Sequence, residues 1–121
     1  MAEHNELGHR GEEEARRFLL KNGYRIVAQN WRYRGYEIDI VAETDDWIVF
    51  VEVKTRSSDE FGNPEDFINN RRIKRLTRGG HHFVMKNNIS KDWRFDVIAI
   101  LWDEHGNFSL KHFDDAFLPN M

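Results

Sequence analysis

Four charged side chains interrupt two otherwise apolar stretches of this sequence. Glu37 and Asp39 lie within GYEIDIVA, and Glu52 and Lys54 lie within WIVFVEVKTR. Burying a charge in apolar surroundings costs free energy unless a partner compensates it. These four residues therefore constrain the fold strongly, because any arrangement that buries the two stretches has to supply them with partners.

The two stretches are predicted to form a β-hairpin that turns at residues 44–47. In this register Asp39 faces Glu52 and Glu37 faces Lys54. Opposed carboxylates about 4.5–5.5 Å apart repel each other unless a proton or a cation lies between them. A hard divalent cation such as Mg²⁺ would resolve that conflict, and the alternative is a structural salt-bridge cluster at a sheet edge. A three-residue loop would instead place Glu52 on the opposite face from Asp39.

A third acidic residue, Glu12, bears on the same site. One face of the predicted hairpin is wholly apolar: Ile38, Ile40, Ala42, Val49, Val51 and Val53. The other is half-charged, with Val41 and Phe50 near the turn. Helical spacing places Glu12 on the stripe of Ala15 and Leu19, and if that stripe packs on the half-charged face, three carboxylates converge. The alternative is that Glu12 only stabilises the positive end of its helix.

The hydrophobic pattern predicts one layered α/β domain with the element order αβββαββ. The expected elements are a helix at 10–22, a strand at 24–33, the hairpin, a helix with Ile73, Leu76, Gly80 and Phe83 inward, and strands at 94–102 and 108–113. Residues 57–66 are an expected loop. Gly79 and Gly80 either weaken the second helix or permit close packing.

The composition is typical of a soluble globular domain, with 40% hydrophobic and 32% charged residues among 121. The segment MAEHNELGHRGEEEARR lacks the apolar part of a secretory signal, and no apolar run approaches the roughly 18 residues of a membrane span. We therefore expect a cytoplasmic protein without a membrane partner. The absence of cysteine excludes disulfides and thiol chemistry, and the six histidines lack zinc-ligand spacing, so we interpret them as surface or structural residues.

Basic side chains gather in one segment although the net charge is −3. Five of them occupy eight positions without an acidic residue: Arg71, Arg72, Lys74, Arg75 and Arg78. Arg32 and Arg34 are predicted to share a strand face. Separate basic patches beside an acidic cleft suit a polyanion such as nucleic acid. The alternative for the helical segment is an ordinary solvated face, although such faces usually mix charges of both signs.

The spacing of Asp39, Glu52 and Lys54 resembles the PD-(D/E)XK nuclease superfamily, in which an acid on one strand is followed by D/E-x-K on the next. A wider set of segments is similar to the YraN family of small bacterial proteins: GEEEA at 11–15, NWR at 30–32, GYEIDIVA at 35–42, VFVEVKTR at 49–56, the basic helix at 71–78 and RFDVIAI at 94–100. The resemblance covers about residues 8–113 of a single domain spanning 1–121. Two departures are Tyr36, where a second glycine is expected, and Ile38, where the superfamily has proline; neither removes a ligand.

The resemblance implies a restriction endonuclease-like core, a central mixed β-sheet flanked by helices, and phosphodiester hydrolysis with Mg²⁺ or Mn²⁺. The metal ligands that it implies are Asp39 and Glu52, the Val53 carbonyl, and Glu12 either directly or through water. Lys54 would orient or deprotonate the attacking water, or neutralise charge in the transition state. Glu37, opposite Lys54 in the predicted register, would keep the amine protonated and so favour the charge-neutralising role.

Three functions from different classes follow. The first is a nuclease that acts on DNA, including branched or otherwise structured forms. The second is a nucleic-acid-binding module that keeps the nuclease fold with little or no catalysis. The third is a protein-interaction domain, such as a homodimer formed through exposed aromatics like Phe113 or Phe117.

Overall fold

The computed structural model describes residues 2–57 and 69–116, which form two helices and five strands. The elements in chain order are α1 (Ala2–Lys21), β1 (Arg25–Tyr33), β2 (Tyr36–Glu43), β3 (Trp47–Ser57), α2 (Asn70–Lys86), β4 (Asp92–Trp102) and β5 (Phe108–Phe113). This is the predicted order αβββαββ. The main difference is that α1 begins at Ala2 rather than at residue 10, while most of the loop expected at 57–66 lies outside the described residues.

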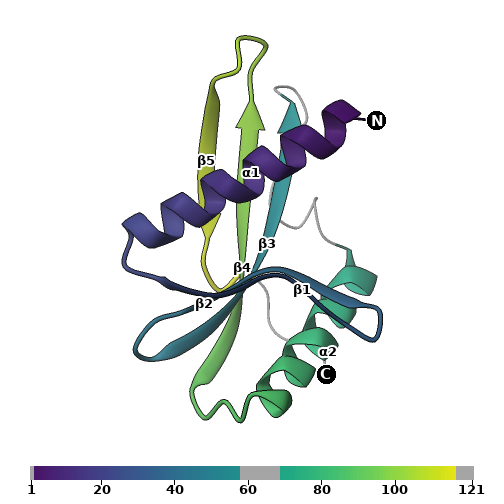
Figure 1. Ribbon diagram of the computed structural model, residues 1–121, viewed down its shortest axis with the longest axis vertical. Coiled ribbons are helices and arrows are strands. Elements are labelled where there is room, and N and C mark those ends of the chain that lie inside the picture. The colour runs from purple at the N-terminus through teal and green to yellow at the C-terminus, as the bar shows by residue number, and fades with distance from the viewer. Residues whose placement is uncertain (1, 58–68, 117–121) are drawn as a thin grey trace.

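The strands form one mixed sheet in the order β1-β2-β3-β4-β5. β3 and β4 pair in parallel, whereas the other neighbouring strands pair antiparallel. Antiparallel neighbours need only short turns, but parallel neighbours need a crossover connection, and α2 lies within the crossover between β3 and β4. Figure 1 shows α1 crossing in front of β3, β4 and β5, while α2 lies lower in the view, beside the β1–β2 hairpin.

The two helices cover different hydrophobic clusters of the sheet. Ala15 and Leu19 of α1 pack with residues of the face predicted to be wholly apolar, among them Ile40, Ala42, Val49 and Val51. The α2 cluster contains Leu76 and Phe83 together with Ile38, Val41, Ile48, Phe50 and Phe95. The expectation that the α1 stripe packs on the half-charged face is therefore wrong. Both faces are apolar near the turn, so either could receive the first helix.

Ile38 also lies on a different side from the one predicted, because alternation along β2 is interrupted. The β1–β2 register is the same on both sides of Asp39, with Gln29 opposite Ile40 and Trp31 opposite Ile38, and its shift lies nearer the start of β1, between Ile26 and Ala28. Asn30, however, has a left-handed φ of 49°. Ile38 consequently joins the α2 cluster, whereas Ile40 joins the α1 cluster. The irregularity falls beside Asp39, the first residue of the candidate site.

Two adjacent glycines allow α2 to approach the sheet closely. A Cβ on Gly80 would lie 3.0 Å from Cε2 of Phe50 and 3.1 Å from Cζ of Phe95. A Cβ on Gly79 would lie 3.3 Å from Cβ of Tyr36 and 3.7 Å from Ile38. Of the two roles that the sequence left open for this pair, the contacts support close packing.

Gly80→Ala is expected to lower the free energy of unfolding by about 1–2 kcal/mol, because the new methyl group presses on two buried rings. Gly79→Ala is the matched control. Both substitutions gain about 1 kcal/mol of helix propensity, but a methyl group at position 79 has longer contacts with its neighbours than one at position 80. Urea unfolding of the two variants measures the difference. Equal stabilities would mean that the rings beside Gly80 move aside without cost.

A buried network of charges joins β4 to β5. Asp96 is fully buried, and its carboxylate accepts hydrogen bonds from Arg94 at 3.0 and 3.2 Å and from the Asp115 backbone N–H at 3.0 Å, and contacts Nε2 of His112 at 2.7 Å. Arg94 also donates to the Tyr24 hydroxyl at 2.8 Å. Burial raises the pKa of Asp96, but His112, Arg94 and the Asp115 N–H outweigh burial, so the net pKa is below its ordinary value. The sequence pattern alone does not predict this network.

No helix within the described part of the chain is long and apolar enough to cross a membrane.

Candidate functional site

The β2–β3 hairpin has the predicted register near its turn. Val41 pairs with Phe50 and Glu43 pairs with Ile48, while the Thr44 N–H donates to the Trp47 carbonyl at 2.9 Å. The Thr44 hydroxyl also accepts hydrogen bonds from the backbone of residues 46 and 47, which fixes the turn. The ladder extends to Ile40 opposite Val51, so Asp39 and Glu52 lie where the two strands begin to separate.

The Asp39 side chain bridges the two strands at this point. Its Oδ2 accepts a hydrogen bond from the Val53 N–H at 2.9 Å. A carboxylate thus supplies an acceptor that a backbone carbonyl would supply in a regular ladder. This contact holds Asp39 directly beside the segment that carries Glu52 and Lys54.

Glu52 is 4% exposed and is held by basic side chains. Arg72 of α2 donates from Nε to Oε2 at 2.8 Å and from Nη2 to Oε1 at 3.0 Å, a two-point contact of the strong, charge-assisted kind. Lys54 Nζ lies 3.7 Å from Glu52 Oε2. Arg72 also donates to the Glu37 carbonyl at 3.3 Å, so one guanidinium joins α2 to both strands of the hairpin.

The carboxyl groups of Asp39 and Glu52 shift each other's pKa through a side-chain hydrogen bond, and the charge of Glu52 acts on Asp39 as well. Burial and the charge of Glu52 raise the pKa of Asp39 to about 8, although the Val53 N–H opposes this shift. Burial also raises the pKa of Glu52, but the hydrogen bond and charge of Arg72 outweigh it, so the net pKa is lowered. The raised pKa favours a proton on Asp39 at neutral pH, while Arg72 favours the ionised form of Glu52.

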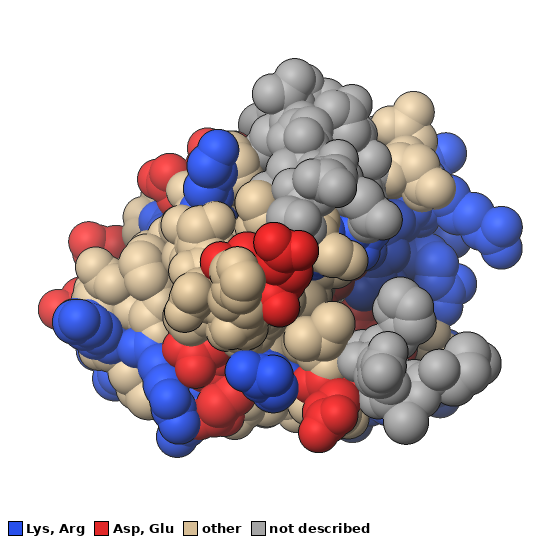
Figure 2. Space-filling model, turned by 90° about the horizontal axis from the view of Figure 1, so that it is seen from above, with Lys and Arg blue, Asp and Glu red and all other residues tan. Residues whose placement is uncertain are grey.

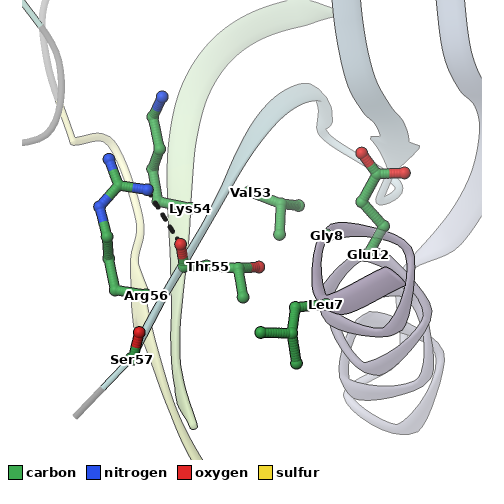
Figure 3. A pocket seen from close by; sticks show the side chains of 8 residues that line it. All are labelled: Leu7, Gly8, Glu12, Val53, Lys54, Thr55, Arg56 and Ser57. Carbon is green, nitrogen blue, oxygen red and sulfur yellow. Dashed lines mark hydrogen bonds between the residues drawn. The ribbon is translucent and has the colours of Figure 1, made fainter. Parts of the chain in front are cut away.

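Glu12 approaches the site from the α1 side of the sheet. Figure 3 shows a pocket between α1 and β3 in which Val53 and Thr55 project toward α1, whereas Lys54 and Arg56 project the other way. The pocket has a volume of about 380 Å³, and both Glu12 and Lys54 line it. Burial raises the pKa of Glu12, opposed by Asn30 and His9, and the charges of Glu37 and Glu52 raise it further.

The structure assembles only part of the predicted site. It brings Asp39, Glu52 and Lys54 together, but in the described residues no group of three acidic or histidine side chains is placed to hold a metal ion. The predicted pairing of Glu37 with Lys54 is wrong. Because the strands separate beyond Ile40, Glu37 instead pairs with Arg32 across β1 and β2, at 3.3 Å.

The five basic residues predicted to bind phosphate in α2, between positions 71 and 78, divide into two groups. Arg71, Lys74, Arg75 and Arg78 are exposed and follow the i, i+3, i+4, i+7 spacing of a single helix face, which we call the α2 basic stripe. Arg72 lies off this stripe and is partly buried against Glu52, so it is not an ordinary surface contact. Figure 2 shows Lys and Arg side chains gathered at the right of the view, whereas acidic and basic side chains mix at the left.

The sequence pattern groups Arg72 with the predicted phosphate-binding residues and does not predict its contact with Glu52. Helical spacing could have indicated that Arg72 points toward the sheet, because it falls between the stripe positions and lies one turn before the buried Leu76. Arg34 was also misplaced: it lies in the β1–β2 turn with a φ of 50°, so it does not share a strand face with Arg32.

The fold and the site together define an α/β protein with a proton-sharing carboxyl pair at the opening between two strands, beside a lysine and an arginine. The element order is consistent with a restriction endonuclease-like core.

Comparison with known proteins identifies the family. The model of the uncharacterised protein family UPF0102 matches residues 11–100. A UPF0102 protein of Flavobacterium psychrophilum is 44% identical over 117 residues, which is 97% of this chain and 98% of the relative. A UPF0102 protein of Bacteroides thetaiotaomicron is 43% identical over 119 residues, 98% of each chain. The chain belongs to the UPF0102 family, and the resemblance to YraN proteins is confirmed.

Proposed function

We propose that this protein hydrolyses phosphodiester bonds in DNA with Mg²⁺ or Mn²⁺. The observation that carries the proposal is the carboxyl pair formed by Asp39 and Glu52, which lies 3.7 Å from an ammonium group at Lys54. Two carboxyl groups whose proximity raises the pKa of one of them, even beside Arg72 and Lys54, are suited to receive a further cation.

The donor set fits a hard divalent cation. Asp39 and Glu52 offer carboxylate oxygens, which Mg²⁺ prefers, and the Val53 carbonyl is a further oxygen on the same strand. Mg²⁺ usually keeps several waters and binds through one or two carboxylates, so a third acidic residue in direct contact is not required. Glu12, on the other side of β3, would act through water. When bound, the ion would lower the pKa of a water molecule and offset negative charge on the phosphate oxygens.

Lys54 would neutralise charge as the attacking water adds to phosphorus. Its ammonium is already paired with Glu52 Oε2 at 3.7 Å, so its positive charge lies beside the carboxyl pair. A protonated lysine donates hydrogen bonds but cannot accept a proton, so charge neutralisation is favoured over general-base catalysis. Lys54 takes this role without Glu37, which pairs with Arg32.

Cleavage assays test the proposal. Linear, circular, single-stranded and branched DNA are incubated with Mg²⁺, Mn²⁺ or EDTA, and products are resolved by electrophoresis. Lys54→Ala is expected to lower the cleavage rate by about a hundredfold or more, a usual loss when a positioned charged or proton-transferring group is removed. Lys111→Ala, an exposed lysine on β5 at the far edge of the sheet, is the matched control and should cleave normally. Equal activity in all preparations would identify a contaminating nuclease.

A second candidate function is a nucleic-acid-binding module without catalysis. The observation that favours it is Arg72, which already neutralises Glu52 through two hydrogen bonds and so reduces the need for a metal ion. This function predicts salt-dependent DNA binding that is lost when the α2 basic stripe is reversed in charge, without metal-dependent products. A homodimer stays a third prediction: Phe113 is half-buried, and Phe117 lies outside the described residues.

Arg72→Gln separates the first two functions. If Arg72 competes with a metal ion for Glu52, its removal should tighten Mn²⁺ binding by about tenfold, since a charge-assisted hydrogen bond contributes about 1.5–3 kcal/mol. Arg75→Gln is the matched control, because Arg75 lies one turn away and donates to the Gly35 carbonyl. Mn²⁺ binding is measured by calorimetry. Heat of binding that is absent from both wild type and Arg72→Gln would exclude a metal site on this pair.

A further inference from the structure

Aromatic and basic side chains surround the β1–β2 turn, which lies alongside α2 from Arg75 to Lys86. The His82 ring lies between the rings of Tyr33 and Tyr36, with centroid distances of 5.4 and 5.2 Å. Arg34 and Lys86 each lie over the Tyr33 ring, at 5.3 and 4.7 Å, and Arg75 lies over the Tyr36 ring at 5.3 Å. We call this set the turn platform: Tyr33, Arg34, Tyr36, Arg75, His82 and Lys86.

The turn platform is held in a fixed shape. Arg34 and Gly35 have φ angles of 50° and 84°, as the two central residues of a type I′ hairpin turn require, and Tyr33 pairs with Tyr36 across the turn. Arg75 of α2 donates to the Gly35 carbonyl, which ties the turn to the helix. An open pocket of about 390 Å³ follows the turn from Arg32 to Glu37. The pocket therefore has rigid walls that carry both rings and cations.

The α2 basic stripe leads to this platform. Continuing its helical spacing from Arg78 by four residues at a time gives His82 and then Lys86, both of which contact Tyr33. Near its start the helix carries Arg72, which donates to Glu52 and to the Glu37 carbonyl. One helix thus connects the carboxyl pair, a row of cations and a group of half-buried rings.

We propose that the turn platform binds an unpaired nucleotide of a DNA strand, with its base against the tyrosine rings and its phosphates on Arg34, Arg75 and Lys86. This inference deepens the proposed function, on which it rests, by naming DNA with a single-stranded segment as the substrate class. Rings combined with cations indicate this ligand, because bases stack on aromatic side chains while the backbone follows a positive groove. Inside paired DNA both faces of each base are covered by its neighbours, so only the end pairs of a duplex could stack on tyrosine.

The test compares two DNA duplexes of equal length, one blunt and one with a single-stranded thymine overhang, by fluorescence anisotropy in EDTA. Wild type should bind the overhang duplex more tightly. The double substitution Tyr33→Ala with Tyr36→Ala should weaken overhang binding by about tenfold and leave blunt-duplex binding unchanged, since stacking contributes about a tenfold factor or more per base. Phe108→Ala, which removes an exposed ring on β5, is the matched control and should change neither affinity.

A second variant protects the test against misfolding. Arg34→Asn keeps a residue type that tolerates positive φ, and it should reduce the dependence of log Kd on log salt by about 0.7 for the overhang duplex alone. Equal wild-type affinity for both duplexes, or equal losses on both in either variant, would overturn the proposal. Because EDTA prevents metal-dependent cleavage, the binding measurements test the turn platform alone. Failure of the proposed function would appear separately, as the absence of cleavage products with Mn²⁺.

Discussion

Asp39→Asn is expected to preserve the fold and to abolish metal binding at the proposed site. At neutral pH Asp39 holds the proton that it shares with Glu52, so an asparagine matches its shape and its hydrogen bonds. The amide oxygen can still accept from the Val53 N–H. Asparagine cannot become an anion, however, so Mn²⁺ affinity should fall. Loss of a residue that only supports a metal ligand lowers affinity by up to about a hundredfold, so loss of a ligand itself should cost at least that much.

The pH dependence of metal binding provides a second readout. Because burial and the charge of Glu52 raise the pKa of Asp39 to about 8, a metal ion has to displace one proton below that pH. Mn²⁺ affinity of the wild type should therefore rise by about tenfold per pH unit up to about pH 8 and then level off. Calorimetry in buffers of different ionisation enthalpy measures the proton release. Asp46→Asn, in the exposed turn of the same hairpin, should behave as wild type.

Without metal, the free energy of unfolding should fall as the pH rises, whereas Mn²⁺ affinity rises with pH. A carboxyl whose pKa is higher in the folded state than in the unfolded state binds more protons when folded, so stability falls as pH rises from about 4 to about 8. Asp39→Asn should remove this slope, as measured by urea unfolding across that range. A variant that retains both the slope and the wild-type affinity for Mn²⁺ would show that Asp39 is neither the shared acid nor a ligand.

Asp96→Asn is expected to have the largest effect on stability, a loss of about 3–5 kcal/mol, as is usual when one partner of a buried ion pair is removed. Asp96 is fully buried and accepts hydrogen bonds from Arg94, so the neutral amide would leave that guanidinium without its counter-charge. Asp92→Asn, exposed in the same strand, is the control and should change stability by less than about 0.5 kcal/mol. Thermal or urea unfolding measures both variants.

The effect of Asp96 should depend on pH with the sign opposite to that of Asp39. The pKa of Asp96 is lowered in the fold because His112, Arg94 and a backbone N–H outweigh its burial. Its contribution to stability is therefore present above the unfolded pKa of about 4 and is lost as the pH falls below it. The difference between wild type and Asp96→Asn should shrink in acid, and a difference that stays constant down to pH 2 would exclude an ionised Asp96 as its source.

The hairpin and its carboxyl pair could be predicted because their signals are local. A polar turn between two apolar stretches fixed which residues of β2 and β3 face each other, and this brought Asp39 and Glu52 to one place. The same pattern could not tell where pairing stops. That point depends on the Asp39 carboxylate, which binds the Val53 N–H and replaces the next backbone contact.

Features that depend on docking between distant segments were not predictable. Hydrophobic residues near the turn occur on both faces of the hairpin, so periodicity alone could not assign the faces to α1 and α2. The partner of Glu52 is Arg72, 20 residues away on a helix whose position is set by tertiary packing. The network around Asp96 likewise joins β4 to residues near the end of β5.

The contact between Asp39 and Val53 has a consequence for how the protein tolerates change. Any residue at position 39 must present an oxygen to the Val53 N–H, which has no backbone carbonyl opposite it. Otherwise that N–H is left without a hydrogen bond inside the sheet. An alanine there would weaken the architecture and the chemistry together, so its phenotype would be ambiguous. The structural role and the chemical role of Asp39 can be separated only by substitutions that keep the oxygen acceptor but remove the negative charge.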